Sequence, residues 1–208
     1  MNVEQAYKNW SGQYDTNSNK TRDLEAVSLK EMINTTYENC LEIGCGTGKN
    51  TQWLVTKCNN ILSVDLTKEM LAIAKAKVPD AKVTFQRADI NQHWDFAGNK
   101  TFDLVVCSLV LEHIENIDRI IGLIAERLNT NGALYISELH PFKQYAGSKA
   151  RYEDENGLHI VTCFTHHISE FTNAAINHGL TIETIKEYFD DNDTSSVPRI
   201  LTLLFRKP

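Results

Sequence analysis

The chain has 208 residues, the size of one ordinary domain, and we expect residues 1–208 to form a single domain. Its 21 Lys and Arg against 27 Asp and Glu give a formal net charge of −6, which argues against a protein that binds nucleic acid by neutralising phosphates. Hydrophobic residues make up 42% before glycine is counted, no apolar run reaches the ~20 residues that span a bilayer, and the N-terminus has no signal-peptide pattern, so we expect a cytoplasmic protein.

The first 38 residues are mixed in pattern, with one helix expected over Asp23–Ile33. From Asn39 onward, short apolar runs that predict buried strands alternate with segments of helical period. The expected strands are Cys40–Ile43, Ile61–Val64, Val83–Phe85, Leu104–Cys107 and Ala133–Ile136. The expected helices between them are Lys49–Lys57, Thr67–Val78 and Ile117–Leu128. Because such alternation forms βαβ units, it predicts an α/β fold with a parallel sheet covered on both faces.

The pattern changes after residue 140. Residues 140–160 fit neither period, and we expect them to form an insertion outside the sheet. A helix over Ile168–His178, ended by Gly179, precedes two strands, Thr181–Glu187 and Ile200–Phe205, whose short connection predicts an antiparallel pair. The seven strands together predict a doubly wound, mostly parallel sheet with an antiparallel edge hairpin. Ligands of such sheets lie beyond the carboxyl ends of the strands, where this insertion is placed to cover them.

The sharpest motif is a glycine-rich turn, Leu41-Glu42-Ile43-Gly44-Cys45-Gly46-Thr47-Gly48-Lys49, which closes the first strand. Glycines at alternate positions permit positive φ and let the backbone approach a ligand closely. The dinucleotide pattern G-x-G-x-x-G fails, because its third glycine falls due at Lys49 or Thr51. The P-loop pattern also fails, because Gly48-Lys49 follows Gly44 too closely and Asn50 stands where the pattern requires Ser or Thr. An ordinary βα turn is the structural alternative.

E-x-G-x-G-x-G at this position resembles the first motif of class I S-adenosylmethionine-dependent methyltransferases, in particular the small type-11 methyltransferase-domain proteins. Four further stretches resemble the family's later motifs in order: Asp65 in ILSVDLTKEML, Arg87-Ala88-Asp89-Ile90, FDLVVCSLVLEHI (102–114) and NTNGALYISELHPF (129–142). The resemblance covers residues 39–206. It implies a Rossmann-like fold with S-adenosyl-L-methionine as cofactor and S-adenosyl-L-homocysteine as product.

The same resemblance implies the cofactor site. Asp65 would accept hydrogen bonds from both ribose hydroxyls, Asp89 would accept from the adenine amine, and the amide of Ile90 would meet the ring. Residues 1–38 would cover the cofactor, with Tyr14 and Arg22 near its methionine end; a surface helix packed on the sheet edge is the alternative. The expected cofactor residues are Tyr14, Arg22, Glu42, Gly44, Cys45, Gly46, Gly48, Asp65, Leu66, Met70, Asp89, Ile90 and Ser108.

Three histidines are candidates for the wall of the methyl site or for a catalytic base. The sulfonium methyl is already activated, so positioning supplies most of the rate, and a base matters where the acceptor loses a proton. The candidates are His140 after the fifth strand, His166 before the next helix, and His113 past the fourth motif; each has a structural alternative as an anchor or helix-end residue. We expect no metal, because a site from His140, His166 and Glu138 lacks short-range ligand spacing.

The insertion over 140–167 is expected to cover an acceptor pocket. Lys149 and Arg151 make it locally basic; Arg151 suits an acceptor carboxylate or phosphate, or else pairs with the acidic run Glu153–Glu155. We therefore expect methyl transfer to a small-molecule or carrier-bound acceptor at O, N, S or C, by a monomer or homodimer with no nucleic-acid partner. The alternatives are a catalytically inactive cofactor-binding partner subunit and, disfavoured by the glycine spacing, a dinucleotide oxidoreductase.

Overall fold

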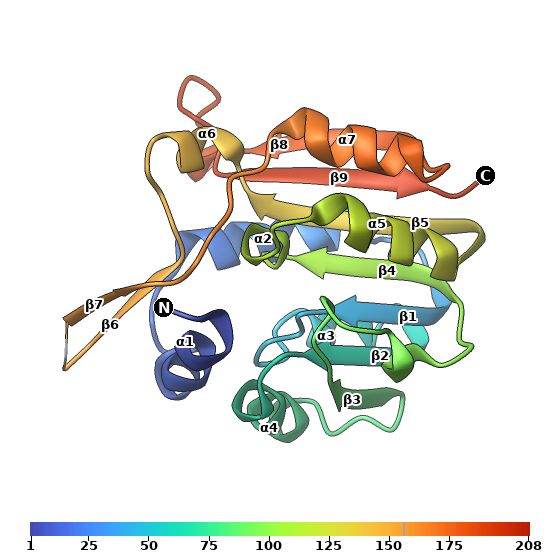
Figure 1. The fold of residues 1–208 in the computed structure, drawn as a ribbon, viewed down its shortest axis with the longest axis horizontal. Coiled ribbons are helices and arrows are strands. Elements are labelled where there is room, and N and C mark those ends of the chain that lie inside the picture. Colours follow the sequence, from blue (N-terminus) through green and yellow to red (C-terminus); the bar gives the residue numbers. More distant parts are fainter. Residues whose placement is uncertain (156) are drawn as a thin grey trace.

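The computed structural model describes residues 1–155 and 157–208, which form a seven-stranded sheet flanked by helices and a separate two-stranded sheet (Figure 1). The order of the large sheet is β3-β2-β1-β4-β5-β9-β8. Its strands are β1 (Tyr37–Ile43), β2 (Cys58–Asp65), β3 (Val83–Arg87), β4 (Phe102–Ser108), β5 (Leu128–Leu139), β8 (Thr181–Tyr188) and β9 (Ile200–Arg206). Neighbours among β1–β5 pair in parallel, and β9 lies antiparallel between β5 and β8. The mostly parallel sheet with an antiparallel edge hairpin is confirmed.

Seven α-helices are assigned in the described residues. They are α1 (Val3–Trp10), α2 (Lys20–Met32), α3 (Thr51–Leu54), α4 (Lys68–Lys77), α5 (Ile117–Arg127), α6 (Pro141–Tyr145) and α7 (Ile168–Asn177). The helix expected over Lys49–Lys57 is wrong in length, because the Lys57 carbonyl accepts from the Tyr37 amide at 2.8 Å and thereby joins the sheet. The helix expected from Asp23 begins earlier, at Lys20, because the Asn19 side chain caps it. None of the helices in the described ranges is long and apolar enough to cross a membrane.

Helices cover both faces of the sheet because successive strand side chains point to opposite sides. Leu41 and Ile43 of β1 pack in one apolar cluster with α5 and α7, whereas Cys40 packs in the other with α2 and α3. Figure 1 shows α5 and α7 in front of the sheet and α2 behind it. Burial on both faces explains why the central strands are continuous apolar runs.

A further layer lies at the carboxyl ends of the parallel strands. The insertion folds into α6 and a hairpin of β6 (Arg151–Asp154) and β7 (Gly157–Ile160), drawn beside α1 in Figure 1. Trp10 of α1 stacks on Tyr152 of β6 with ring centres 5.5 Å apart, in a cluster completed by Ala6 and Val161. The N-terminal segment and the insertion therefore pack against each other through an apolar contact.

Candidate functional site

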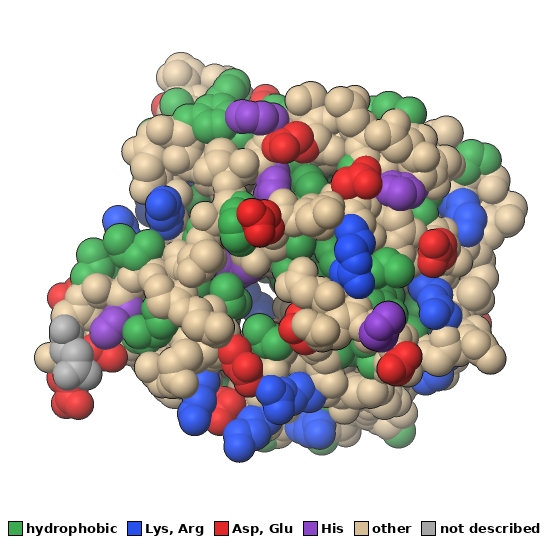
Figure 2. All heavy atoms as spheres, viewed as in Figure 1, with side chains coloured by type: hydrophobic (Ala, Val, Ile, Leu, Met, Phe, Trp, Pro, Cys, Tyr) green, Lys and Arg blue, Asp and Glu red, His purple; other side chains and the backbone are tan. Residues whose placement is uncertain are grey.

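Three adjoining cavities lie where the parallel strands end. Their volumes are about 320, 60 and 370 Å³, and we call them the first, second and third cavity. Tyr14 and Leu109 line all three, so the three meet at these residues. Figure 2 shows the face hollowed near its centre, between α1 and the end of β4.

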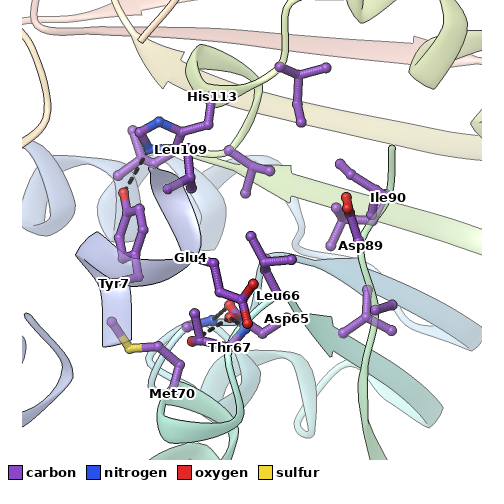
Figure 3. Close-up of a pocket in the computed structure, with 18 of the residues that line it drawn as sticks. Glu4, Tyr7, Asp65, Leu66, Thr67, Met70, Asp89, Ile90, Leu109 and His113 are labelled. Carbon is purple, nitrogen blue, oxygen red and sulfur yellow. Dashed lines mark hydrogen bonds between the residues drawn. The ribbon is translucent and has the colours of Figure 1, made fainter. Parts of the chain in front are cut away.

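The first cavity is built on Asp65, which ends β2 (Figure 3). One oxygen of the Asp65 carboxylate accepts from the Gly46 amide at 2.9 Å, and the other accepts from the amide and hydroxyl of Thr67 at 2.9 and 3.0 Å. A carboxylate has about four acceptor positions, so an acceptor position is left for a ligand hydroxyl. Met70 of α4 and the Asp89–Ile90 segment after β3 supply further wall residues.

The glycine-rich turn requires glycine for two different reasons. Gly44, Gly46 and Gly48 have φ of 70°, 53° and 81°, which L side chains rarely adopt. A Cβ on Gly44 would lie 2.2 Å from a methyl of Val110. A Cβ on Gly46 would meet no atom within 4 Å, because this residue faces the first and second cavities. The turn thus exposes bare backbone to a ligand, and the space is large enough to hold one.

The second cavity brings both signs of charge together. Its charged lining residues are Arg22, Glu25, Glu42 and Lys49. One oxygen of Glu42 accepts from the hydroxyls of Thr51 and Ser63 at 2.7 and 2.6 Å. Its other oxygen is buried without a hydrogen-bond partner among the described residues, and burial raises the pKa of Glu42 to about 7. Such a lining complements a zwitterionic amino-acid group, whose ammonium would meet the acids and whose carboxylate would meet the bases.

The N-terminal segment is fastened over these cavities by polar contacts. Asp15 accepts from the Thr47 hydroxyl of the glycine turn at 2.7 Å and pairs with Lys77 of α4 at 2.6 Å. The Arg22 guanidinium lies 4.0 Å from the centre of the Tyr14 ring. Burial raises the pKa of Tyr14 to about 12, so its phenol stays protonated at neutral pH.

His113 lines the first cavity with both ring nitrogens occupied (Figure 3). Nδ1 lies 2.8 Å from the carbonyl oxygen of Thr162, which can only accept, so Nδ1 donates. In the neutral ring, Nε2 then accepts from the Tyr7 hydroxyl at 2.8 Å. These bonds fix the ring between α1 and the segment that precedes α7.

His140 and His166 lie outside the linings of the three cavities as the structure describes them. His140 is fully buried at the start of α6; its Nδ1 accepts from the Phe142 amide at 3.2 Å, and its Nε2 lies 3.0 Å from a carboxylate oxygen of Glu187 on β8. His166 donates from Nε2 to the Ile114 carbonyl at 2.7 Å. Both side chains join the insertion and its flanks to neighbouring elements.

Of the 13 residues expected at the cofactor site, Gly48 is the one that the structure does not place in the lining of the first or second cavity. Gly48 instead packs on α4, where a Cβ would lie 3.2 Å from the Cα of Ala74. No group of three His, Cys, Asp or Glu side chains in the described ranges is arranged to hold a metal.

Glu25 and Leu109 are among the lining residues that the sequence analysis did not predict. Glu25 is a buried acid that lines the second cavity. It lies four residues before the buried Leu29 and therefore on the same face of the helix, and this spacing is the sequence signal that could have identified it. Leu109 has a φ of 55°. The local sequence gives no indication of this backbone conformation, because leucine rarely adopts positive φ.

Comparison with known proteins finds a matching family for part of the chain. Residues 41–136 match the family described as a methyltransferase domain. The ubiquinone biosynthesis O-methyltransferase of Rickettsia canadensis is 28% identical over 106 residues, which cover 50% of this chain and 44% of that protein. The chain spans about half the length of the first curated relatives that it matches.

Two solved structures share the fold. The S-adenosylmethionine dependent methyltransferase from Mesorhizobium loti has a TM-score of 0.70 at 22% identity, covering 87% of this chain and 96% of that one. The N-methyltransferase NodS from Bradyrhizobium japonicum WM9, in complex with S-adenosyl-L-homocysteine, has a TM-score of 0.75 at 18% identity and covers 100% of both chains. The domain match and the shared fold agree: residues 41–136 match a methyltransferase domain, and the chain has the fold of these two solved methyltransferases.

Proposed function

We propose that this chain transfers the methyl group of S-adenosylmethionine to an O, N, S or C atom of a small-molecule or carrier-bound acceptor. The observation that carries the proposal is the meeting of three cavities at Tyr14 and Leu109. The first cavity would hold adenosine, the second the amino-acid tail, and the third the acceptor. The reacting atoms would then meet where the three join.

The residues present fit this cofactor. Asp65 retains an acceptor position for a ribose hydroxyl, and Asp89 lies in the same cavity with the apolar side chains of Leu66 and Met70. In the second cavity, the free oxygen of Glu42 suits an ammonium. The bound cofactor supplies an activated methyl group, and the chain contributes the binding, the alignment of the acceptor and the exclusion of water.

The covering segments supply this exclusion in the proposal. Residues 1–38 close over the cofactor through the contacts of Asp15 and the Tyr7–His113 pair, and residues 140–167 cover the acceptor side. Among the histidines we assign His113 to the site, where it positions the Tyr7 hydroxyl at the cavity wall. His140 and His166 hold the insertion in this assignment.

Calorimetry with S-adenosylhomocysteine tests the proposal, and we expect saturable binding of one molecule per chain. Asp65→Ala should weaken this binding by about 1–3 kcal/mol, because the ribose hydroxyls lose their charged acceptor. Glu126→Ala, at an exposed position of α5, is the matched control and should leave the affinity unchanged. The absence of binding to the wild-type protein would refute the proposal, and equal affinity in Asp65→Ala would refute the ribose assignment.

Isotopically labelled S-adenosylmethionine, incubated with a metabolite extract and the pure protein, tests catalysis. We expect label to appear in a product whose yield at limiting cofactor concentration falls when Asp65→Ala replaces the wild type. Cofactor binding without any transferred label would favour the inactive partner subunit instead.

A further inference from the structure

The third cavity is strongly basic in an acidic protein. Its charged lining residues are Lys20, Arg22, Lys149, Arg151 and Arg199, against Glu112 as the one acid among the described lining residues. The first cavity is the opposite: its lining includes Glu4, Asp65 and Asp89 and, within the described chain, no Lys or Arg. Two adjoining cavities of opposite charge character are built for two different ligands.

Three of these cations are already engaged by the protein. Both carboxylate oxygens of Asp190 accept from Arg199, at 2.5 and 2.6 Å. Lys20 lies 3.7 Å from Asp191, and Arg22 donates to backbone carbonyls of its own segment. These three residues add to the positive potential of the cavity, and Arg199 and Arg22 already use part of their donors within the protein.

Lys149 and Arg151 are different, because their side chains make no hydrogen bond or ion pair with any other residue that the structure describes. The acidic run that follows Arg151 makes no ion pair with either cation among the described contacts, and Asp154 of this run pairs with His159 at 2.8 Å. Lys149 and Arg151 both line the third cavity, where the Arg151 guanidinium can bind a carboxylate or phosphate through two hydrogen bonds and the Lys149 ammonium can add a point charge.

The segment that carries these two cations is held in place. Tyr152, next to Arg151, is buried against Trp10, and the Val161 amide donates to the Ala150 carbonyl at 3.0 Å. Figure 2 shows basic side chains at the left of the hollowed face, where the chain runs from α6 to β6. Lys149 and Arg151 therefore lie on backbone that these contacts hold in place at the start of β6.

The one acid in this lining is buried. Glu112 is 7% exposed, and burial raises the pKa of its carboxyl. It lies in the turn after β4, on the side of the cavity that approaches the junction at Leu109.

We propose that the methyl acceptor carries an anionic group, a carboxylate or a phosphate, which Lys149 and Arg151 bind in the third cavity while the reacting atom reaches the junction at Tyr14 and Leu109. This inference rests on the proposed function, because the third cavity accepts a methyl acceptor only if the other two hold the cofactor. Lys149 and Arg151 are then specificity-determining residues that do not touch the reacting atoms.

The test uses the full chain saturated with S-adenosylhomocysteine and titrated with inorganic phosphate or with acetate at low ionic strength. We expect saturable binding of at least one of these anions, weakened about tenfold or more in Lys149→Gln/Arg151→Gln. The ratio of the two affinities shows whether the site favours phosphate or carboxylate. Lys100→Gln, an exposed cation outside the lining of all three cavities, is the matched control and should bind as the wild type does.

The outcomes separate this inference from the proposed function. Loss of anion binding with unchanged affinity for S-adenosylhomocysteine supports the inference. Anion binding that is absent, or equal in the double variant and the wild type, overturns it and leaves the cofactor assignment standing. A wild-type protein that does not bind S-adenosylhomocysteine overturns the proposed function first. In the labelled-extract experiment, the methylated product should be retained on an anion exchanger, and Arg151→Gln should raise KM for that fraction more than it lowers kcat.

Discussion

At the scale of a single residue, the proposed function predicts that Glu42 makes cofactor affinity depend on pH. Its pKa is raised to about 7 by burial, one of its oxygens has no hydrogen-bond partner among the described residues, and Glu42 lines the cavity proposed for the amino-acid tail. The ionised form attracts the cofactor's ammonium and the protonated form does not. We therefore expect the affinity for S-adenosylhomocysteine to fall as pH decreases from 8 to 6, approaching tenfold per pH unit at the acid end.

Calorimetry across this range with Glu42→Gln checks the residue responsible. The amide keeps an acceptor for the hydroxyls of Thr51 and Ser63 but cannot ionise, so the step near pH 7 should disappear. Glu126→Gln is the control and should retain the wild-type profile. A wild-type affinity that is flat between pH 6 and 8 would contradict the pairing of Glu42 with the ammonium.

The turn after β4 is the element on which all three cavities depend, and β5 holds it. One oxygen of Glu138 accepts from the amides of Val110 and Leu111 at 3.0 and 2.8 Å, and the Leu109 amide donates to the Ser137 carbonyl at 2.8 Å. Glu138→Ala leaves buried amides unpaired, so we expect it to lower the free energy of unfolding by about 1–3 kcal/mol. Chemical denaturation measures this loss.

Glu138→Ala should also weaken S-adenosylhomocysteine binding, because the positive φ of Leu109 is no longer enforced by its neighbours. Glu138→Gln keeps an acceptor for the amides and should bind closer to the wild type. If Glu138→Ala lowered stability with no change in affinity, the turn would not control the cavities.

Hydropathy predicted the buried middle of the central strands well and the strand ends poorly; Val83–Phe85, expected as a buried strand, lies in the edge strand β3, which has no buried residue. The run Ile61–Val64 marked β2, but the polar residues Asn59 and Asn60 extend this strand by backbone pairing with β1, which carries no hydropathy signal. Motif spacing identified Asp65 as a site residue because the end of a strand and the turn that follows it are both local features of the sequence. Arg199 reaches the third cavity through the return of β9 beside β5, and its place in the site follows from tertiary structure that local patterns do not encode.

The whole molecule buries several carboxyls, and this sets how its stability depends on pH. Burial raises the pKa of Glu42 to about 7 and of Glu138 to about 8, and it also raises the pKa of Glu25 and Glu112. The folded state therefore binds more protons than the unfolded chain between about pH 4.5 and 8, so these groups make the unfolding free energy fall as pH rises through that window.

His140 acts in the opposite direction over a lower range. Burial lowers its pKa below 6.5, so its contribution to stability is present above pH 6.5 and is lost as pH falls. Between pH 6.5 and 8 the carboxyls act without this opposition. We expect denaturant unfolding to give a lower free energy at pH 8 than at pH 6.5, and Glu138→Gln to reduce the difference because it removes the group with the higher pKa. An unfolding free energy that rises between pH 6.5 and 8 would contradict this prediction. It would mean that the buried carboxyls stay ionised over the whole interval, with their charge stabilised by the amides that donate to them.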